Sequence, residues 1–165
     1  WTGGVAFTEY GIVALGVSTA QLGWGESAMA HEMAHLVVHQ VTMNGYGIVL
    51  PNWLDEGLAM YAEGELSSDL ASALSSAMKR GRLDSVQSLS SSFPADTAGA
   101  TLAYAESYSL VEYLLENKGS RENMLKLLGA IRAGSGYEEA LQEVYGLSIS
   151  QLDSQWKQYL MAGGA

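Results

Sequence analysis

Residues 26–42 are the segment that most restricts how this chain can fold, because their hydrophobic pattern has the period of an α-helix. At about 100° per residue, the histidines of the segment and Glu32 fall within one arc of roughly 100°. Apolar side chains cover most of the remaining circumference, so we expect a helix that is buried nearly all round and ends before Asn44-Gly45. Its one polar strip should therefore face a cleft. The strip consists of Ala28, His31, Glu32, His35 and His39.

Within this helix, residues 31–35 read HEMAH, which is an HExxH pattern. Its two imidazoles, His31 and His35, stand one turn apart on one face, close enough to bind a single metal ion. Glu32 lies beside them, where a carboxylate can take a proton from a water whose pKa a Zn²⁺ ion has lowered. The alternative is a pair of hydrogen-bonded core histidines with Glu32 as an internal salt-bridge partner. We prefer the metal site, because burying two imidazoles and a carboxylate on an apolar helix is costly without a strong partner.

The metal site needs a third ligand from another part of the chain. His39 lies about 12 Å along the helix axis from His31, too far to share an ion, so we expect it to be structural or to support the ligands. Two histidines leave zinc short of the three protein ligands usual in a catalytic site. Glu56 follows His35 by 56 − 35 = 21 positions, on a second predicted helix that a turn can bring back antiparallel over the site. Gly57 beside it would permit close approach of the two helices, which a Cβ would oppose.

Two other carboxylates compete with Glu56 for the third ligand position. The second helix is expected over residues 52–64, with Asn52 as its N-cap and Asp55 as the partner in a capping-box-like pair. This capping role argues against Asp55 as a ligand, and Glu63 lies near the end of the helix. We therefore expect Glu56 to be the ligand.

The rest of the chain is expected to form a small N-terminal sheet followed by helices. Residues 5–17 are mostly apolar or β-branched and are broken at residues 9–11, which predicts two short strands. The stretch 85–100 is rich in serine and is expected to be a long loop or a mobile lid. Helices are expected near 66–80, 98–117, 121–133, 137–145 and 149–161. The last two have predicted caps, Ser135 with Glu138 and Ser148 with Gln151. The predicted fold class is α+β and mostly helical, in one domain of 165 residues.

Composition limits the partners of the chain. The net charge of −10 and the pI near 4.5 argue against nucleic acid, whose binding depends on Lys and Arg neutralising phosphates. No apolar run has the length of a membrane helix, so no membrane contact is expected within this segment. The absence of cysteine excludes disulfides and thiolate metal sites. Because the chain begins at Trp1 without a signal segment, we interpret it as a piece of a longer chain.

Residues 31–35, followed by WLDEGLA at residues 53–59, resemble the gluzincin clan of zinc metallopeptidases, and most closely its peptidase MA-like group. The resemblance extends to residues 103–110 and to a closing helix around Trp156. It implies a zincin-like metallopeptidase fold in which the strand around residues 13–16 forms the upper rim of the cleft and pairs with an extended substrate. In such a fold the N-terminal part is an upper subdomain and the helical C-terminal part a lower one. The implied division is 1–64 and 65–165, within a single peptidase MA-like catalytic domain.

The resemblance also implies a site. One Zn²⁺ per chain would be held by His31, His35 and Glu56, with Glu32 as the general base. A gluzincin usually needs a Tyr or His that donates a hydrogen bond to the oxyanion.

Two tyrosines are candidates for this donor. Tyr104 and Tyr108 lie one turn apart on one predicted helix, at a similar distance after Glu56 as the tyrosine of the clan, and we favour Tyr104. The alternative for both is packing with a satisfied hydroxyl.

The chain also departs from members of the clan. Nothing matches the GxMEN segment that anchors a substrate's free amino terminus in the aminopeptidases, so an endopeptidase is slightly favoured. Thermolysin-like members place an aspartate four residues after the third ligand, where this chain has Met60. The groups that support the ligands must therefore differ.

The predicted function is zinc-dependent hydrolysis of bonds in a peptide or protein substrate, with an extracytoplasmic location that the resemblance favours. The first alternative is a zinc-binding but inactive peptidase-like domain, used as a binding or scaffold module of a larger surface protein. A structural helical domain without metal is a second alternative, and a protease whose cleft a further N-terminal part blocks or completes is a third. Cleavage specificity and oligomeric state stay open.

Overall fold

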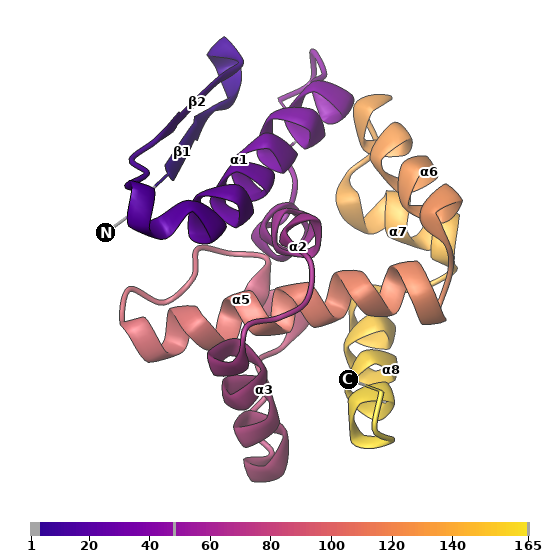
Figure 1. Cartoon of the computed structure of the whole chain (residues 1–165). Helices are drawn as coiled ribbons and strands as arrows, with labels where there is room; N and C mark the ends of the chain where they lie inside the picture. Colours follow the sequence, from indigo (N-terminus) through magenta and orange to yellow (C-terminus); the bar gives the residue numbers. More distant parts are fainter. Residues whose placement is uncertain (1–3, 48, 165) are drawn as a thin grey trace.

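The computed structural model describes residues 4–47 and 49–164, which form a mostly helical molecule with one two-stranded sheet (Figure 1). This arrangement confirms the expected class, while Trp1 lies outside the described residues. The elements are β1 (Gly4–Phe7), the 3₁₀ turn η1 (Thr8–Tyr10), β2 (Ile12–Leu15), the 3₁₀ turn η2 (Thr19–Gln21), α1 (Leu22–Thr42), α2 (Asn52–Glu63), α3 (Ser68–Arg80), α4 (Val86–Leu89), α5 (Thr97–Glu112), the π-helical turn η3 (Tyr113–Asn117), α6 (Arg121–Arg132), α7 (Tyr137–Tyr145) and α8 (Ile149–Met161).

The two predicted strands form an antiparallel hairpin in which Phe7 of β1 pairs with Ile12 of β2. Gly11 closes the connection in the left-handed region, at a φ of 64°, which costs glycine no steric strain. One face of the hairpin rests against α1 (Figure 1). Because side chains alternate along a strand, Val5, Phe7 and Ile12 point to the other face, where they are 41%, 47% and 54% exposed.

Helix α1 begins at Leu22, four residues earlier than predicted, and ends at Thr42 as expected. The expectation that it is buried nearly all round is wrong, because Met29, Met33 and Val37 are 45%, 45% and 53% exposed. These side chains are four residues apart and form one stripe. The hairpin, α2 and α6 pack against other faces of α1 and leave this stripe to solvent.

Helix α2 is the central helix of the molecule and is seen nearly end-on between α1 and α5 in Figure 1. Trp53 and Leu54, near its start, are each 1% exposed. At Gly57 the helix lies so close to α5 that a Cβ would overlap the carbonyl oxygen of Ser107 and come within 2.7 Å of Val111 Cγ2. The predicted close approach at Gly57 therefore exists, but its partner is α5 and not α1.

The helices expected in the C-terminal half are all present; the helix expected near 98–117 is α5 continued by the π-helical turn η3, and the other bounds lie within two residues of the prediction. The short helix α4 is an addition within the serine-rich stretch. The predicted cap of α8 is confirmed, since Ser148 Oγ accepts the N–H of Gln151 at 3.3 Å. The predicted cap of α7 is wrong by one residue, because Gly136 and not Ser135 is the N-cap, and its N–H donates to Glu139 Oε2 at 3.3 Å.

The hydrophobic core runs from α2 through α5 to α8. Trp156 is fully buried, and its Nε1–H donates to Ser109 Oγ at 2.9 Å, which satisfies the only polar group of this indole. Helix α1 contributes no residue to the fully buried cluster of the described chain; Val41 packs at its edge. The largest fully buried side chains are Trp53, Trp156, Leu54, Leu110, Leu114, Leu127, Ile131, Leu141, Leu152 and Leu160.

One acidic group, Glu106 of α5, is fully buried in this core. Its Oε1 accepts the N–H of Asp84 at 2.9 Å, which ties the connection after α3 to α5, whereas its Oε2 has no partner among the described residues. Burial raises the pKa of Glu106 to about 8; the charges of Asp84 and Asp153 also raise it, whereas the hydrogen bond from the Asp84 N–H and the charge of Lys157 lower it. The carboxyl group is therefore protonated in the folded protein at neutral pH.

Glu106→Gln should make the protein less sensitive to alkaline pH. Folding raises the pKa of Glu106 from 4.5 to about 8, so its contribution to stability is fully present below pH 4.5 and is lost as the pH rises through about 8. Glutamine keeps an acceptor for Asp84 and has no proton to lose. We expect the melting temperature to fall less between about pH 5.5 and about pH 8.5 in the variant than in the wild type. Parallel pH profiles for the two proteins would contradict this.

Gly57→Ala should destabilise the protein by about 1–3 kcal/mol, because the new methyl group overlaps the backbone of α5 and forces the helices apart. Gly129→Ala is the matched control. Gly129 is an exposed position within α6, where a Cβ meets nothing within 4 Å, so alanine should be neutral or stabilise by up to about 1 kcal/mol. Urea unfolding of both variants measures the difference, and equal effects would exclude a special role for Gly57.

Candidate metal centre

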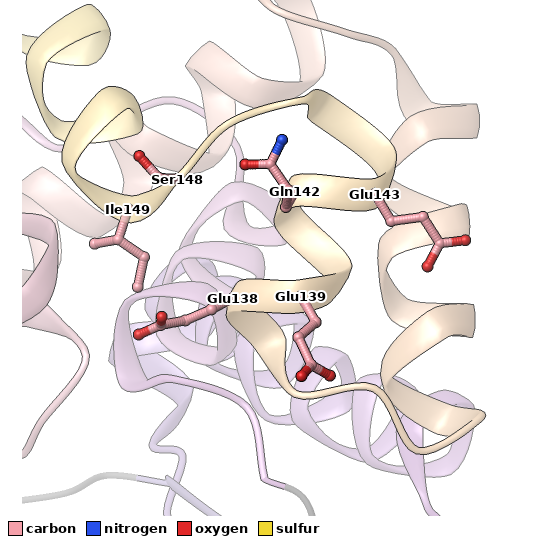
Figure 2. A pocket seen from close by; sticks show the side chains of 6 residues that line it. All are labelled: Glu138, Glu139, Gln142, Glu143, Ser148 and Ile149. Carbon is pink, nitrogen blue, oxygen red and sulfur yellow. The ribbon is translucent and has the colours of Figure 1, made fainter.

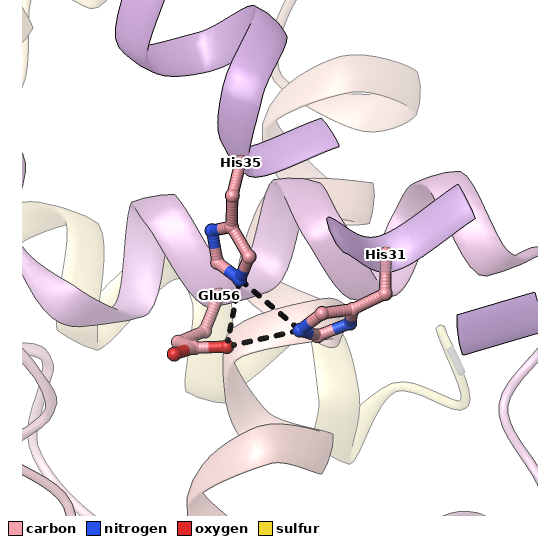
Figure 3. A group of neighbouring side chains, drawn as sticks. All are labelled: His31, His35 and Glu56. Carbon is pink, nitrogen blue, oxygen red and sulfur yellow. Dashed lines mark hydrogen bonds and ion pairs between the residues drawn. The ribbon is translucent and has the colours of Figure 1, made fainter. Parts of the chain in front are cut away.

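Three predicted ligands, His31, His35 and Glu56, converge at the contact between α1 and α2 (Figure 3). The two Nε2 atoms lie 3.1 Å apart. Oε2 of Glu56 lies 3.5 Å from His31 Nε2 and 3.6 Å from His35 Nε2. The three atoms thus form a nearly equilateral triangle.

Helix geometry accounts for this convergence. His31 and His35 are one turn apart on α1, and their ring centroids are 4.8 Å apart in an edge-on arrangement. Helix α2 then returns against the same face of α1 and presents Glu56 from its second turn. The histidine strip therefore faces α2, and the side chains of His31 and His35 are only 17% and 13% exposed.

The triangle fits a metal ion. Donor atoms around a tetrahedral Zn²⁺, at about 2.0–2.1 Å from it, are separated from each other by about 3.3 Å. Oε2 of Glu56 is buried and makes no hydrogen bond among the described residues; its contacts with the two imidazoles, at 3.5 and 3.6 Å, are longer than hydrogen bonds, and a buried carboxylate oxygen without a hydrogen bond is costly. A cation between this oxygen and the two nitrogens would remove that cost. The donor set of two imidazoles and one carboxylate can hold a metal ion, and it is a ligand set known for catalytic zinc.

The outer nitrogen of each ring also has a carboxylate partner. His31 Nδ1 lies 2.6 Å from Glu63 Oε1, and His35 Nδ1 lies 3.2 Å from Asp55 Oδ2. The expected capping role of Asp55 is wrong: Pro51 is the N-cap of α2, and no side chain caps the helix. Sequence reasoning weighed Asp55 and Glu63 only as rival ligands. The signal it missed is that Glu63 follows Glu56 by seven residues and thus lies on the same face of α2.

The charges of the site perturb its ionisation. Burial lowers the pKa of His31, but the carboxylates of Glu56 and Glu63 outweigh burial and raise it to about 9. Burial likewise lowers the pKa of His35, which Asp55 and Glu56 raise to about 10. Burial raises the pKa of Glu56, but the two imidazoles outweigh burial and lower it to about 2. Protons and a metal ion therefore compete for the same two nitrogens, so metal binding should release protons.

Glu32 follows His31 on α1, and its side chain lies close to β1 of the hairpin. A Cβ on Gly4 of β1 would come within 2.9 Å of Glu32 Oε1, so the missing side chain of Gly4 leaves room for the carboxylate. Within the described chain Glu32 makes no hydrogen bond or ion pair, which leaves its oxygens available. The strand expected at residues 13–16 is β2 (Ile12–Leu15), which pairs with β1 and packs against α1. Its role as the upper rim of a cleft stays a prediction.

The two candidate tyrosines have different surroundings. Burial raises the pKa of Tyr104, and the negative charges of Glu56 and Glu32 raise it further. Its ring packs edge-on against Phe93, with centroids 5.2 Å apart. The hydroxyl of Tyr108 donates to Glu112 on the same helix at 3.3 Å. Of the two hydroxyls, that of Tyr108 thus has a hydrogen-bond partner on its own helix, and the serine-rich segment supplies Phe93 as the packing partner of Tyr104.

A cavity of about 450 Å³ adjoins the site on the side of α1 that leads to its C-terminus. His35 and Asp55 form part of its wall, together with His39, one turn further along the helix. His39, which was expected to be structural or to support the ligands, thus lines a cavity and lies apart from the triangle.

A second cavity, of about 480 Å³, lies between α7 and the start of α8 (Figure 2). Its carboxylates belong to Glu138, Glu139 and Glu143, which are exposed residues of α7. Exposed carboxylates remain hydrated, so the charge of this cavity does not require a ligand.

No helix in the described part of the chain is long and apolar enough to span a membrane.

Comparisons with known proteins agree with the site. Searches among curated proteins and among solved structures gave no match. A family model, described as Peptidase MA superfamily, matches residues 1–162. The match covers nearly the whole chain, and the chain therefore belongs to the Peptidase MA superfamily.

Proposed function

We propose that the chain is a zinc-dependent peptidase that cleaves bonds within peptide or protein substrates. The observation that carries the proposal is the triangle of His31, His35 and Glu56, whose 3.1–3.6 Å edges match a tetrahedral ion. Membership of a peptidase superfamily supports the choice of reaction. An internal bond is preferred as the target because the chain lacks the GxMEN segment that holds a free amino terminus.

The chain's own residues would divide the chemistry as follows. Held by His31, His35 and Glu56, zinc would polarise the scissile carbonyl and lower the pKa of a water molecule. Glu32, whose carboxylate has no other partner in the described chain, would take a proton from the attacking water and pass it to the leaving amine. Tyr104 would donate its O–H to the oxyanion that develops on the carbonyl, and Phe93 would hold its ring in place.

Metal content tests the ligand set. Protein purified without added metal should carry one zinc per chain, and His35→Ala and Glu56→Ala should each weaken zinc binding by well over 100-fold, because each removes a ligand. His39→Ala is the matched control, since it removes an imidazole from the same helix outside the triangle and should retain the zinc. Elemental analysis after dialysis measures this. Zinc retained in Glu56→Ala would move the third ligand to another carboxylate, and the absence of metal even after incubation with zinc would end the enzyme hypothesis.

Activity on an unstructured protein, such as casein, tests the catalytic roles. Glu32→Gln should keep its zinc and lose activity by a factor of about 10²–10⁴, because proton transfer is removed. Tyr104→Phe should lower kcat by roughly 10²–10³-fold, whereas Tyr108→Phe should change kcat little, because its hydroxyl is bonded to Glu112. The reverse order of the two tyrosine variants would contradict the assignment. Zinc bound by the wild type without any hydrolysis would favour the inactive binding module.

A further inference from the structure

Glu63 makes the shortest polar contact of the metal centre, and the proposed reaction gives this residue no role. Its Oε1 lies 2.6 Å from His31 Nδ1, and its side chain is 27% exposed. A surface ion pair of two flexible side chains contributes little to stability. Here one partner is an imidazole that is 17% exposed and held between two helices. The contact is therefore a charge-assisted hydrogen bond in a restricted position.

The chemistry of this bond fixes the tautomer of His31. A carboxylate has no proton to donate, so Nδ1 must carry the hydrogen and donate it. In a neutral imidazole the lone pair is then on Nε2, the atom that points toward Glu56 and His35. A carboxylate on the outer nitrogen also makes the inner nitrogen a stronger ligand.

The position of Glu63 on α2 explains how one helix can contact both nitrogens of His31. Glu56 and Glu63 are seven residues apart, so both point from the same face of α2 toward α1. Glu56 reaches the inner nitrogen of His31 and Glu63 reaches the outer one. Two carboxylates of one helix thus contact both nitrogens of the imidazole. Met60, which lies between them, is 9% exposed and cannot replace either carboxylate.

We propose that Glu63 is a positioning residue that holds His31 in the orientation and tautomer needed to bind the metal. This inference rests on the proposed zinc site and extends it to a residue that is not itself a ligand. Asp55 contacts the outer nitrogen of His35 in the same way, at 3.2 Å, with a side chain that is 40% exposed.

The test compares zinc affinity among variants of the full chain, measured by competition with a chelating dye. Glu63→Leu removes both charge and acceptor, and should weaken zinc binding by about 10–100-fold, as losses of such outer partners typically do. Glu63→Gln keeps an acceptor for Nδ1–H but loses the charge, so its loss should be smaller. Glu65→Gln is the control, because Glu65 is an exposed glutamate just beyond the end of α2.

A spectroscopic readout separates positioning from mere structural support. In the zinc-loaded wild type, nitrogen-detected NMR of the imidazoles should show the proton of His31 on Nδ1. In Glu63→Leu this signal should shift or broaden while the other imidazole signals stay in place. Loss of helix structure alone would change all of them together.

The outcomes distinguish this inference from the proposed function. Zinc affinity and a His31 signal in Glu63→Leu equal to those in Glu65→Gln would overturn the role of Glu63 and leave the zinc peptidase intact. Tight zinc binding that depends on Glu63, without hydrolysis of any substrate, would support the role and refute the peptidase. A wild type that binds no zinc would refute both.

Discussion

The contact of α2 with α5 at Gly57 is the constraint on which the rest of the structure depends. Because Gly57 has no side chain, α2 rests directly on the backbone of α5 at Ser107. The short distance between α2 and α5 in turn sets the distance between α2 and α1, which lies on the opposite side of α2. Glu56 is the neighbouring residue, and a displacement of α2 by even 1 Å would change the 3.5 and 3.6 Å separations that make the site fit a metal ion. The core and the site are thus built on the same contact.

The two helices supply different groups to the site. Helix α1 supplies both imidazoles and Glu32, whereas α2 supplies Asp55, Glu56 and Glu63 within twelve residues. Four carboxylates near one another repel, and removing them partly from water increases the cost. Protons on the imidazoles reduce this cost, which is why their pKa values rise. A divalent cation would neutralise the same charge while leaving the imidazoles neutral, so the acidic surroundings favour a metal over an apolar packing of the two helices.

The sequence predicted the local features of this structure well. Periodicity and glycine stops located the helices of the C-terminal half to within two residues, when α5 and η3 are taken together, because most of these helices are amphipathic and have their own end signals. The HExxH spacing and a carboxylate 21 positions later identified three residues that the fold brings together. These predictions needed only helix geometry and the coordination chemistry of zinc.

The errors concern contacts between elements distant in sequence. Asp55 has the spacing of a capping residue, but its contact with His35 becomes visible only when α1 and α2 are placed side by side. Gly57 was matched to the wrong helix for the same reason, since nothing in its surroundings along the chain indicates α5. The burial of α1 was overestimated because an apolar helix surface does not determine how many other helices or strands pack against it. The stripe of Met29, Met33 and Val37 has none among the described elements.

The weak anchoring of α1 gives the metal centre a structural consequence. The fully buried core begins at Trp53, and α1 reaches it only through Val41 at the edge. Besides the packing of α1 against α2 and α6, the ion pairs of His31 and His35 join α1, with the hairpin upon it, to α2. A ligand that binds only the folded arrangement stabilises it in proportion to its affinity and concentration. A metal ion held between α1 and α2 would thus restrain α1, which contributes no residue to the buried cluster of the described chain. The positions of Glu32 and β1 both depend on α1. The ion that the proposed role of Glu32 requires would therefore also hold these two parts in place.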